Sequence, residues 1–76
     1  MSEADWLDIF GDNLVGILRE FRMTQNDLAD AIGVSKSVVS SWINKQKMPS
    51  LKSIINMSHV LGVTVDELVY FDDKII

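Results

Sequence analysis

Side chains that could bind a polar or anionic partner lie on one side of a helix predicted to follow Ser35. They are Lys36, Ser37, Ser40, Ser41 and Asn44. The opposite side of the same helix carries Val39, Trp42 and Ile43 at the spacing of an apolar helical stripe. An ammonium group among hydroxyls and an amide can both donate and accept hydrogen bonds. The pattern predicts a binding surface on a helix whose other side enters the core.

The sequence has no comparable set of residues for catalysis or metal binding. His59 is the only histidine, and the chain has no cysteine. A single histidine can neither anchor a metal site nor order a nucleophile and a base. The four glycines are too scattered to form a phosphate-binding loop. We therefore expect a protein that is not an enzyme and uses no cofactor and no metal, in which His59 is structural or solvated.

Charges are distributed unevenly along the 76 residues. The net charge of −4 by itself disfavours binding to nucleic acid. Residues 1–30 hold seven acidic side chains and residues 66–76 hold four, whereas residues 31–65 hold none. The formal charges of that middle stretch all belong to lysines, namely Lys36, Lys45, Lys47 and Lys52. This distribution predicts an acidic protein with one basic face, although a chance block of charge on a solvated surface would give the same counts.

Two short helices joined by a glycine turn must position the polar side chains. Thr24 and Asp27 have the spacing of a capping box, with Asp in place of the usual Glu or Gln, and predict a helix start. Gly33 suits the left-handed conformation that ends a helix, and Ser35 is a fresh N-cap. Two short helices around a glycine turn, the second with a polar outer face, form the helix-turn-helix arrangement.

The stretch from Thr24 to Asn44 resembles the helix-turn-helix of the Cro/CI-type (XRE-type) family of bacterial and phage repressors. The segment around Phe10 resembles that family's first helix, and residues 48–68 resemble its last two helices. The likeness extends without gaps from about Phe10 to Tyr70. It implies an all-α, compact five-helix, lambda-repressor-like domain that binds double-stranded operator DNA as a homodimer.

The resemblance also implies roles for individual residues, because the second helix of such a motif enters the major groove and the first anchors on the DNA backbone. Carried over by position, the candidates for base contacts are Lys36, Ser37 and Ser41. The candidates for backbone contacts are Thr24, Gln25, Ser40, Asn44, Lys45, Gln46 and Lys47. A merely polar helix face is the alternative interpretation of the serines. Small hydroxyls make few bidentate contacts, so we expect recognition to rely partly on water and DNA shape.

Several positions depart from the family pattern. Arg22 stands where the family usually has a turn glycine, which predicts a modified turn or an arginine at positive φ. Leu18 and Ile43 stand where many members have an arginine–glutamate ion pair, and we expect the two apolar side chains to contact each other instead. Gly16 weakens the first helix and could allow a close helix contact.

We divide the chain into a helical N-terminal extension at residues 1–9, a helix-turn-helix domain at residues 10–70 and an apolar tail at residues 71–76. The tail could be a dimer contact or could dock on its own domain. The apolar spacing within the first and fourth helices predicts that the following side chains point inward: Leu14, Ile17, Leu18, Phe21, Leu51, Ile54, Ile55, Met57 and Leu61.

The predicted function is sequence-specific DNA binding by a small bacterial or phage transcriptional regulator of the cytoplasm. The N-terminus lacks the pattern of a signal peptide, and no apolar run is long enough to span a bilayer. A Cro-type repressor, a restriction–modification controller and an antitoxin-type autoregulator all fit. An alternative from another class is a protein-binding module of the same fold, such as an antirepressor. A structural domain without a nucleic-acid role is the third interpretation.

Overall fold

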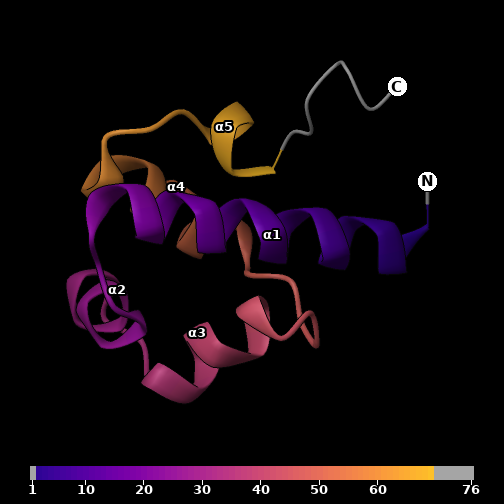
Figure 1. Cartoon of the computed structure of the whole chain (residues 1–76), viewed down its shortest axis with the longest axis horizontal. Coiled ribbons are helices and arrows are strands. Elements are labelled where there is room, and N and C mark those ends of the chain that lie inside the picture. Colours follow the sequence, from indigo (N-terminus) through magenta and orange to yellow (C-terminus); the bar gives the residue numbers. More distant parts are fainter. Residues whose placement is uncertain (1, 70–76) are drawn as a thin grey trace.

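The computed structural model describes residues 2–69, and these residues form five α-helices and no strand (Figure 1). The helices are α1 (Glu3–Phe21), α2 (Gln25–Ile32), α3 (Lys36–Ile43), α4 (Leu51–Leu61) and α5 (Val65–Val69). The long α1 crosses the molecule, with α2 and α3 below it and α5 above it in Figure 1. The expected all-α, five-helix fold is confirmed. The apolar tail at residues 71–76 lies outside the described residues.

Side-chain caps set the starts of the helices that carry the motif. The Thr24 amide donates to Asp27 Oδ2 over 2.9 Å, and the Asp27 amide donates to Thr24 Oγ1 over 3.0 Å. These two bonds satisfy amides that have no partner within α2. Ser35 accepts from the Val38 amide at the start of α3, and Ser50 caps α4 in the same way. Helices α2 and α3 therefore begin at the predicted caps.

Helix α1 begins well before Phe10. Ser2 is its N-cap, because the Asp5 amide donates to Ser2 Oγ over 3.3 Å and the Ser2 amide donates to Asp5 Oδ2 over 3.0 Å. The segment before Phe10 is thus the first part of α1 and not a separate turn. It places Asp8 and Asp12 on one continuous helix, one turn apart.

The core is formed by buried apolar side chains from all five helices. They are Phe10, Leu14, Leu18, Leu28, Ala29, Val39, Trp42, Ile54, Met57, Leu61 and Leu68. The rings of Phe10 and Trp42 meet edge to face, with centroids 6.4 Å apart and planes at 77°. This is a favoured geometry for an aromatic pair. It fixes the inner side of α3 against α1, so the polar side of α3 faces outward.

Three apolar residues that we expected to point inward are instead exposed. Leu51 keeps 70% of its surface, Ile55 42% and Phe21 40%. On α4 the core stripe is occupied by Ile54 and its partners further along the helix, and Ile55 lies about 100° round the helix from Ile54. Leu51 begins α4 and Phe21 ends α1, so both lie at helix ends beyond the edge of the core.

Arg22 adopts the left-handed conformation, with φ 56° and ψ 39°, and ends α1. Its amide donates to the Arg19 carbonyl over 3.2 Å, and the next amide, of Met23, donates to the Leu18 carbonyl over 2.9 Å. These bonds complete the turn that a glycine usually forms. The expected arginine at positive φ is therefore confirmed.

Gly16 could have allowed a close helix contact, but the structure has such a contact at Gly11 instead. A Cβ atom added to Gly16 would have no heavy atom of a neighbouring element within 4 Å. A Cβ added to Gly11 would lie 2.9 Å from Lys45 Cγ and 3.1 Å from the Trp42 carbonyl oxygen. The end of α3 therefore packs directly on the backbone of α1, and a larger residue at position 11 would push it away.

Candidate nucleic-acid interface

Helix α3 forms a ridge with a hollow on each side. One hollow lies toward the start of α2 and is lined by Thr24, Gln25, Asn26, Lys36 and Ser40. The other lies toward the start of α4 and is lined by Ser37, Val38, Ser41, Trp42, Lys47, Met48, Pro49, Ser50 and Ser53. We call them the α2 hollow and the α4 hollow. Each contains one lysine, so positive charge flanks α3 on both sides.

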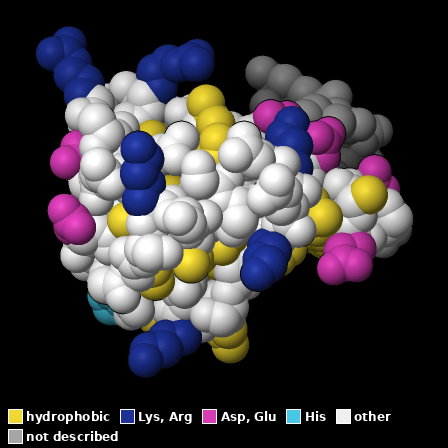
Figure 2. Space-filling view, turned by 90° about the horizontal axis from the view of Figure 1, so that it is seen from below, with side chains coloured by type: hydrophobic (Ala, Val, Ile, Leu, Met, Phe, Trp, Pro, Cys, Tyr) yellow, Lys and Arg dark blue, Asp and Glu magenta, His cyan; other side chains and the backbone are white. Residues whose placement is uncertain are grey.

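The face around this ridge is shown in Figure 2, which views the molecule from the side of α2 and α3. Lysine and arginine side chains are spread across the view, whereas the acidic side chains of the described residues gather toward its left and right edges. Helix α3 itself has no acidic residue in its first turn. An anionic partner approaching the ridge would therefore meet hydroxyls and lysines first.

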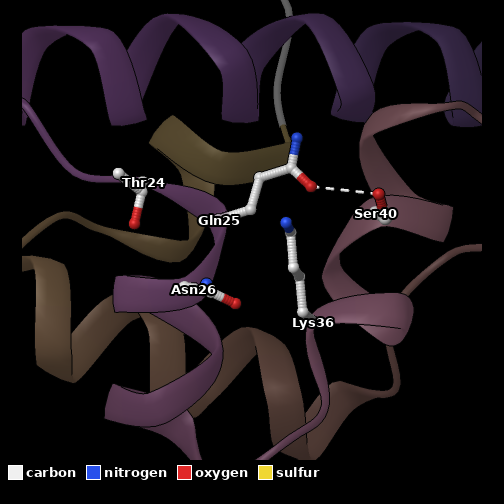
Figure 3. A pocket seen from close by; sticks show the side chains of 5 residues that line it. All are labelled: Thr24, Gln25, Asn26, Lys36 and Ser40. Carbon is white, nitrogen blue, oxygen red and sulfur yellow. Dashed lines mark hydrogen bonds between the residues drawn. The ribbon is translucent and has the colours of Figure 1, made fainter.

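In the α2 hollow, the Ser40 hydroxyl donates to Gln25 Oε1 over 3.0 Å (Figure 3). The bond occupies the amide oxygen and leaves the Nε2 group of Gln25 with hydrogens to donate. Gln25 is the first residue of α2, where unpaired backbone amides and the helix dipole also favour an anion. Lys36 extends into the same hollow toward Gln25 (Figure 3). The hollow thus combines an oriented amide, an ammonium group and a helix start.

In the α4 hollow, the Ser41 hydroxyl donates to the Val38 carbonyl over 2.6 Å. Its donor is therefore used within α3, and Ser41 can offer a ligand only the lone pairs of its oxygen. Ser37 is exposed on the preceding turn. Lys47 reaches this hollow because its amide, like that of Gln46, bonds back to the Ser41 carbonyl. The loop after α3 is thereby folded against the end of the helix.

Lys45 points away from both hollows and toward α1. Its Nζ lies 2.8 Å from Asp8 Oδ1 and 2.9 Å from Asp12 Oδ1. The Asp8 carboxylate, followed by that of Asp12, raises the pKa of Lys45 above its ordinary value. The Lys45 backbone is left-handed, with φ 63°. In this geometry its charge is already neutralised by the protein, and a phosphate contact would require it to leave both carboxylates.

Asn44 ends α3 and Gln46 follows it in the loop, and both are exposed. The Asn44 amide donates to the Ser40 carbonyl over 2.9 Å. Both side chains are exposed, but neither lines one of the two hollows. Of the sequence-predicted site residues, the structure brings Thr24, Gln25, Lys36 and Ser40 together in the α2 hollow. It brings Ser37, Ser41 and Lys47 together in the α4 hollow.

Leu18 and Ile43, which stand where many family members have an ion pair, both line one hollow that α1 and α3 share with the start of α2. Leu18 is 5% exposed, and Ile43 packs against the core cluster. Apolar side chains thus fill a place where two charges would have to be desolvated. Both positions are apolar and border the same hollow, and a direct contact between Leu18 and Ile43 stays a prediction.

Several residues that line the two hollows were not among the predicted contacts, and the exposed residues among them include Asn26 and Val38. Asn26 lines the α2 hollow, and Val38 lines the α4 hollow with 40% of its surface exposed. Val38 is apolar and therefore was not among the predicted polar contacts. Its position between Ser37 and Val39 could have revealed it, since it falls outside the stripe formed by Val39 and Trp42.

Other kinds of site were sought among residues 2–69. No group of three or more His, Asp or Glu side chains is arranged there to hold a metal ion. None of the helices in this range combines the length and hydropathy that a bilayer-spanning segment requires.

Comparison with known proteins identifies the family. Residues 17–68 match the family model described as helix-turn-helix. The chain is 28% identical over 60 residues to the uncharacterized HTH-type transcriptional regulator YqaE of Bacillus subtilis (strain 168), covering 79% of this chain and 52% of that protein. It is 29% identical over 66 residues to the HTH-type transcriptional activator BcrR of Enterococcus faecalis, covering 87% of this chain and 32% of that protein.

The chain therefore spans about half the length of the first relative and about a third of the second. No solved structure matches it significantly. The family match covers more than half of the chain and includes α2, α3 and α4. The chain belongs to the XRE-type helix-turn-helix family of DNA-binding transcriptional regulators.

Proposed function

We propose that this chain binds a specific operator in double-stranded DNA as a homodimer, inserts α3 into the major groove and acts as a repressor-like regulator. The residues that would carry this function belong to the unit at residues 10–70. The observation that carries the proposal is the ridge of α3 between two hollows, each with one lysine. A helix lying in the major groove has a phosphate backbone on either side of it, and the two hollows offer a cation to each.

The arrangement assigns separate tasks to the candidate residues. Ser37 and Ser41 lie on the outer side of α3 and would meet base edges, Ser41 as an acceptor only. Gln25 would donate to a phosphate through Nε2, held in place by Ser40. Lys47 would bind the backbone on the other side of the groove.

Lys36 is proposed as a base contact, and its position beside Gln25 would also allow it to reach a phosphate. Thr24, Asn44 and Gln46 are proposed as further backbone contacts at the edges of the interface. Lys45 joins them only if DNA displaces Asp8 and Asp12 from it. Most of these contacts position the protein, whereas few of them read the sequence.

The net charge of −4 is compatible with this proposal because charge is separated in space. Acidic side chains lie toward the edges of the face in Figure 2. Two of them, Asp8 and Asp12, share one lysine and therefore repel a phosphate less than free carboxylates would. Local charge at the ridge, more than the total, governs the approach of DNA.

The testing experiment is a binding titration of the full chain against random-sequence duplex DNA at about 50 and about 200 mM salt, followed by selection of the preferred duplex from the same pool. At about −0.9 for each phosphate neutralised, Lys47 in both subunits of a dimer would give a slope of log K against log salt of about −1.8, which would become about −3.6 if Lys36 also binds a phosphate in each subunit. Enrichment of a two-fold symmetric sequence, with half-sites about one helical turn apart, is expected for a homodimer. Absence of binding at the lower salt would overturn the proposal.

A protein-binding function, such as that of an antirepressor, is the second candidate. It is favoured by the exposed apolar side chains of Leu51 and Ile55 on α4. Failure to bind DNA together with formation of a defined complex with a partner regulator would support it.

The direction of regulation is a separate question, because one relative is named an activator. If the chain is repressor-like, it should decrease the expression of a reporter placed under the selected operator. Increased expression would show that it activates transcription instead.

A further inference from the structure

We infer that Val38 is a specificity-determining residue that reads the C5-methyl group of a thymine in the major groove. This inference rests on the proposed function and names a base that the α3 surface selects. Val38 lies on the outer side of α3, next to Ser37 and one turn before Ser41. It is 40% exposed, whereas its neighbour Val39 is fully buried. Val38 lies about 100° round the helix from Val39 and therefore outside the buried stripe.

The exposure of Val38 has no explanation in folding. Valine loses side-chain freedom in a helix, and α3 has only eight residues in which to recover that cost. Val38 belongs neither to the buried core nor to the apolar side chains that pack against it. Isolated apolar residues are common on protein surfaces. This one, however, lines the α4 hollow together with Ser37 and Ser41, the residues proposed to meet base edges.

The neighbours of Val38 suit a close approach to a base edge. Ser37 and Ser41 are small, so α3 can come near the floor of the groove without steric conflict. The Ser41 hydroxyl donates back to the Val38 carbonyl over 2.6 Å, which removes a free donor from this part of the surface. A thymine presents a methyl group in the major groove, and no other standard base does so. Contact between that methyl and the branched valine would remove both from water.

The rest of the protein surface that would surround the thymine belongs to the α4 hollow. Val38 lines this hollow together with Trp42, Met48 and Pro49, which give it an apolar floor. Lys47 lines the same hollow and would bind the adjacent phosphate. The hollow can therefore hold the backbone through Lys47 while Val38 contacts the base of a neighbouring nucleotide.

The test uses the full chain and the duplex that it selects from a random pool. Each thymine of the half-site is replaced in turn by deoxyuridine, which lacks only the C5-methyl group. For one thymine in each half-site, the dissociation constant of the unchanged protein should rise about fourfold per methyl group lost. For Val38→Ala, the same replacement should have no further effect.

Val60→Ala is the matched control, because Val60 is 45% exposed but lies on α4 outside both hollows. It should retain the full response to deoxyuridine. Val38→Thr, which exchanges one of the two γ-methyl groups for a hydroxyl, should keep part of the response, because a threonine methyl can still contact the thymine methyl. The inference is overturned if the protein binds its duplex specifically but Val38→Ala abolishes the response to deoxyuridine at no thymine. The proposed function would then still stand. Absence of DNA binding would overturn both.

Discussion

The Ser40 hydroxyl, on α3, donates a 3.0 Å hydrogen bond to Oε1 of Gln25, the first residue of α2. The bond joins the two helices of the motif at the side chains that would meet the DNA backbone. It orients the Gln25 amide so that Nε2 is the group left to donate. The geometry of the interface thus depends on one contact between residues fifteen positions apart.

Replacing Ser40 by alanine should weaken DNA binding because Gln25 is no longer held with its donor outward. The loss of one hydrogen bond that fixes a phosphate-binding group is worth about 1 kcal/mol, or about a fivefold rise in the dissociation constant. Fluorescence anisotropy on the selected duplex would measure it. In a Gln25→Ala background, Ser40→Ala should have little further effect, and full additivity of the two changes would show that Ser40 acts independently.

Lys36→Ala should weaken specific binding by about 1–3 kcal/mol and relax the preference at one base pair. Lys52→Ala is the control, because Lys52 belongs to the same basic stretch but lines neither hollow. Affinities for a panel of single-base variants of the operator would reveal the change in preference. A uniform loss across all variants would reassign Lys36 to a phosphate beside Gln25, where its side chain lies in Figure 3.

The helices and their order could be predicted from the sequence because their signals are local. Thr24 with Asp27, Gly33 and Ser35 each fix a helix end through bonds within a few residues. The unusual turn at Arg22 was predictable from the family resemblance, because Arg22 stands where the family usually has a turn glycine. The exposure of Leu51 and Ile55 was not, because apolar spacing shows which residues share a helix face but not how far the core extends along it.

Most residues of the candidate site could be predicted from the sequence, but not which of them lie together in one hollow. Sequence position placed Gln25 and Lys36 among DNA contacts, yet only the fold shows that they share a hollow. Lys45 illustrates the limit most clearly. It belongs to the basic stretch of the sequence, but α1 brings Asp8 and Asp12 to it from more than thirty positions away. Such long-range pairing leaves no local signal.

Replacing Asp8 and Asp12 together by asparagine should strengthen DNA binding, because it frees Lys45 and removes negative charge beside the interface. If Lys45 then binds a phosphate, the salt slope should steepen by about 0.9 for each subunit. The matched control is Glu20→Gln with Asp30→Asn, which removes the same charge elsewhere. Equal salt slopes for the two double variants would show that Lys45 does not reach the DNA even when it is released.

The capping box of α2 should make stability depend on acid pH. The hydrogen bond from the Thr24 amide, and then that from its side chain, lowers the pKa of Asp27 below its ordinary value of 3.8. A lowered pKa in the folded state stabilises the protein above the unfolded pKa, and this contribution is lost as the pH falls below about 4. Thermal unfolding between pH 6 and pH 3 should therefore show a smaller decline for Asp27→Asn. Asp30→Asn, on the same helix, should decline as the unchanged protein does.

The two glycines of α1 should respond to alanine in opposite ways. Gly11→Ala places a Cβ 2.9 Å from Lys45 Cγ and 3.1 Å from the Trp42 carbonyl oxygen, so the end of α3 must shift. We expect a loss of about 1–3 kcal/mol in the free energy of unfolding. Gly16→Ala meets no neighbouring element within 4 Å and should gain about 0.5–1 kcal/mol from helix propensity. Urea denaturation of both variants would measure the changes.

The variants Gly11→Ala and Gly16→Ala also distinguish an effect on stability from an effect on DNA binding. Because Gly11 supports the carbonyls at the end of α3 and the stem of Lys45, Gly11→Ala should also displace the loop that carries Lys47. Its affinity for the selected duplex should fall even at temperatures where the variant remains folded, whereas Gly16→Ala should bind as the unchanged protein does. Unaltered binding by folded Gly11→Ala would mean that the loop adjusts without moving Lys47, and that the close packing on α1 serves stability alone.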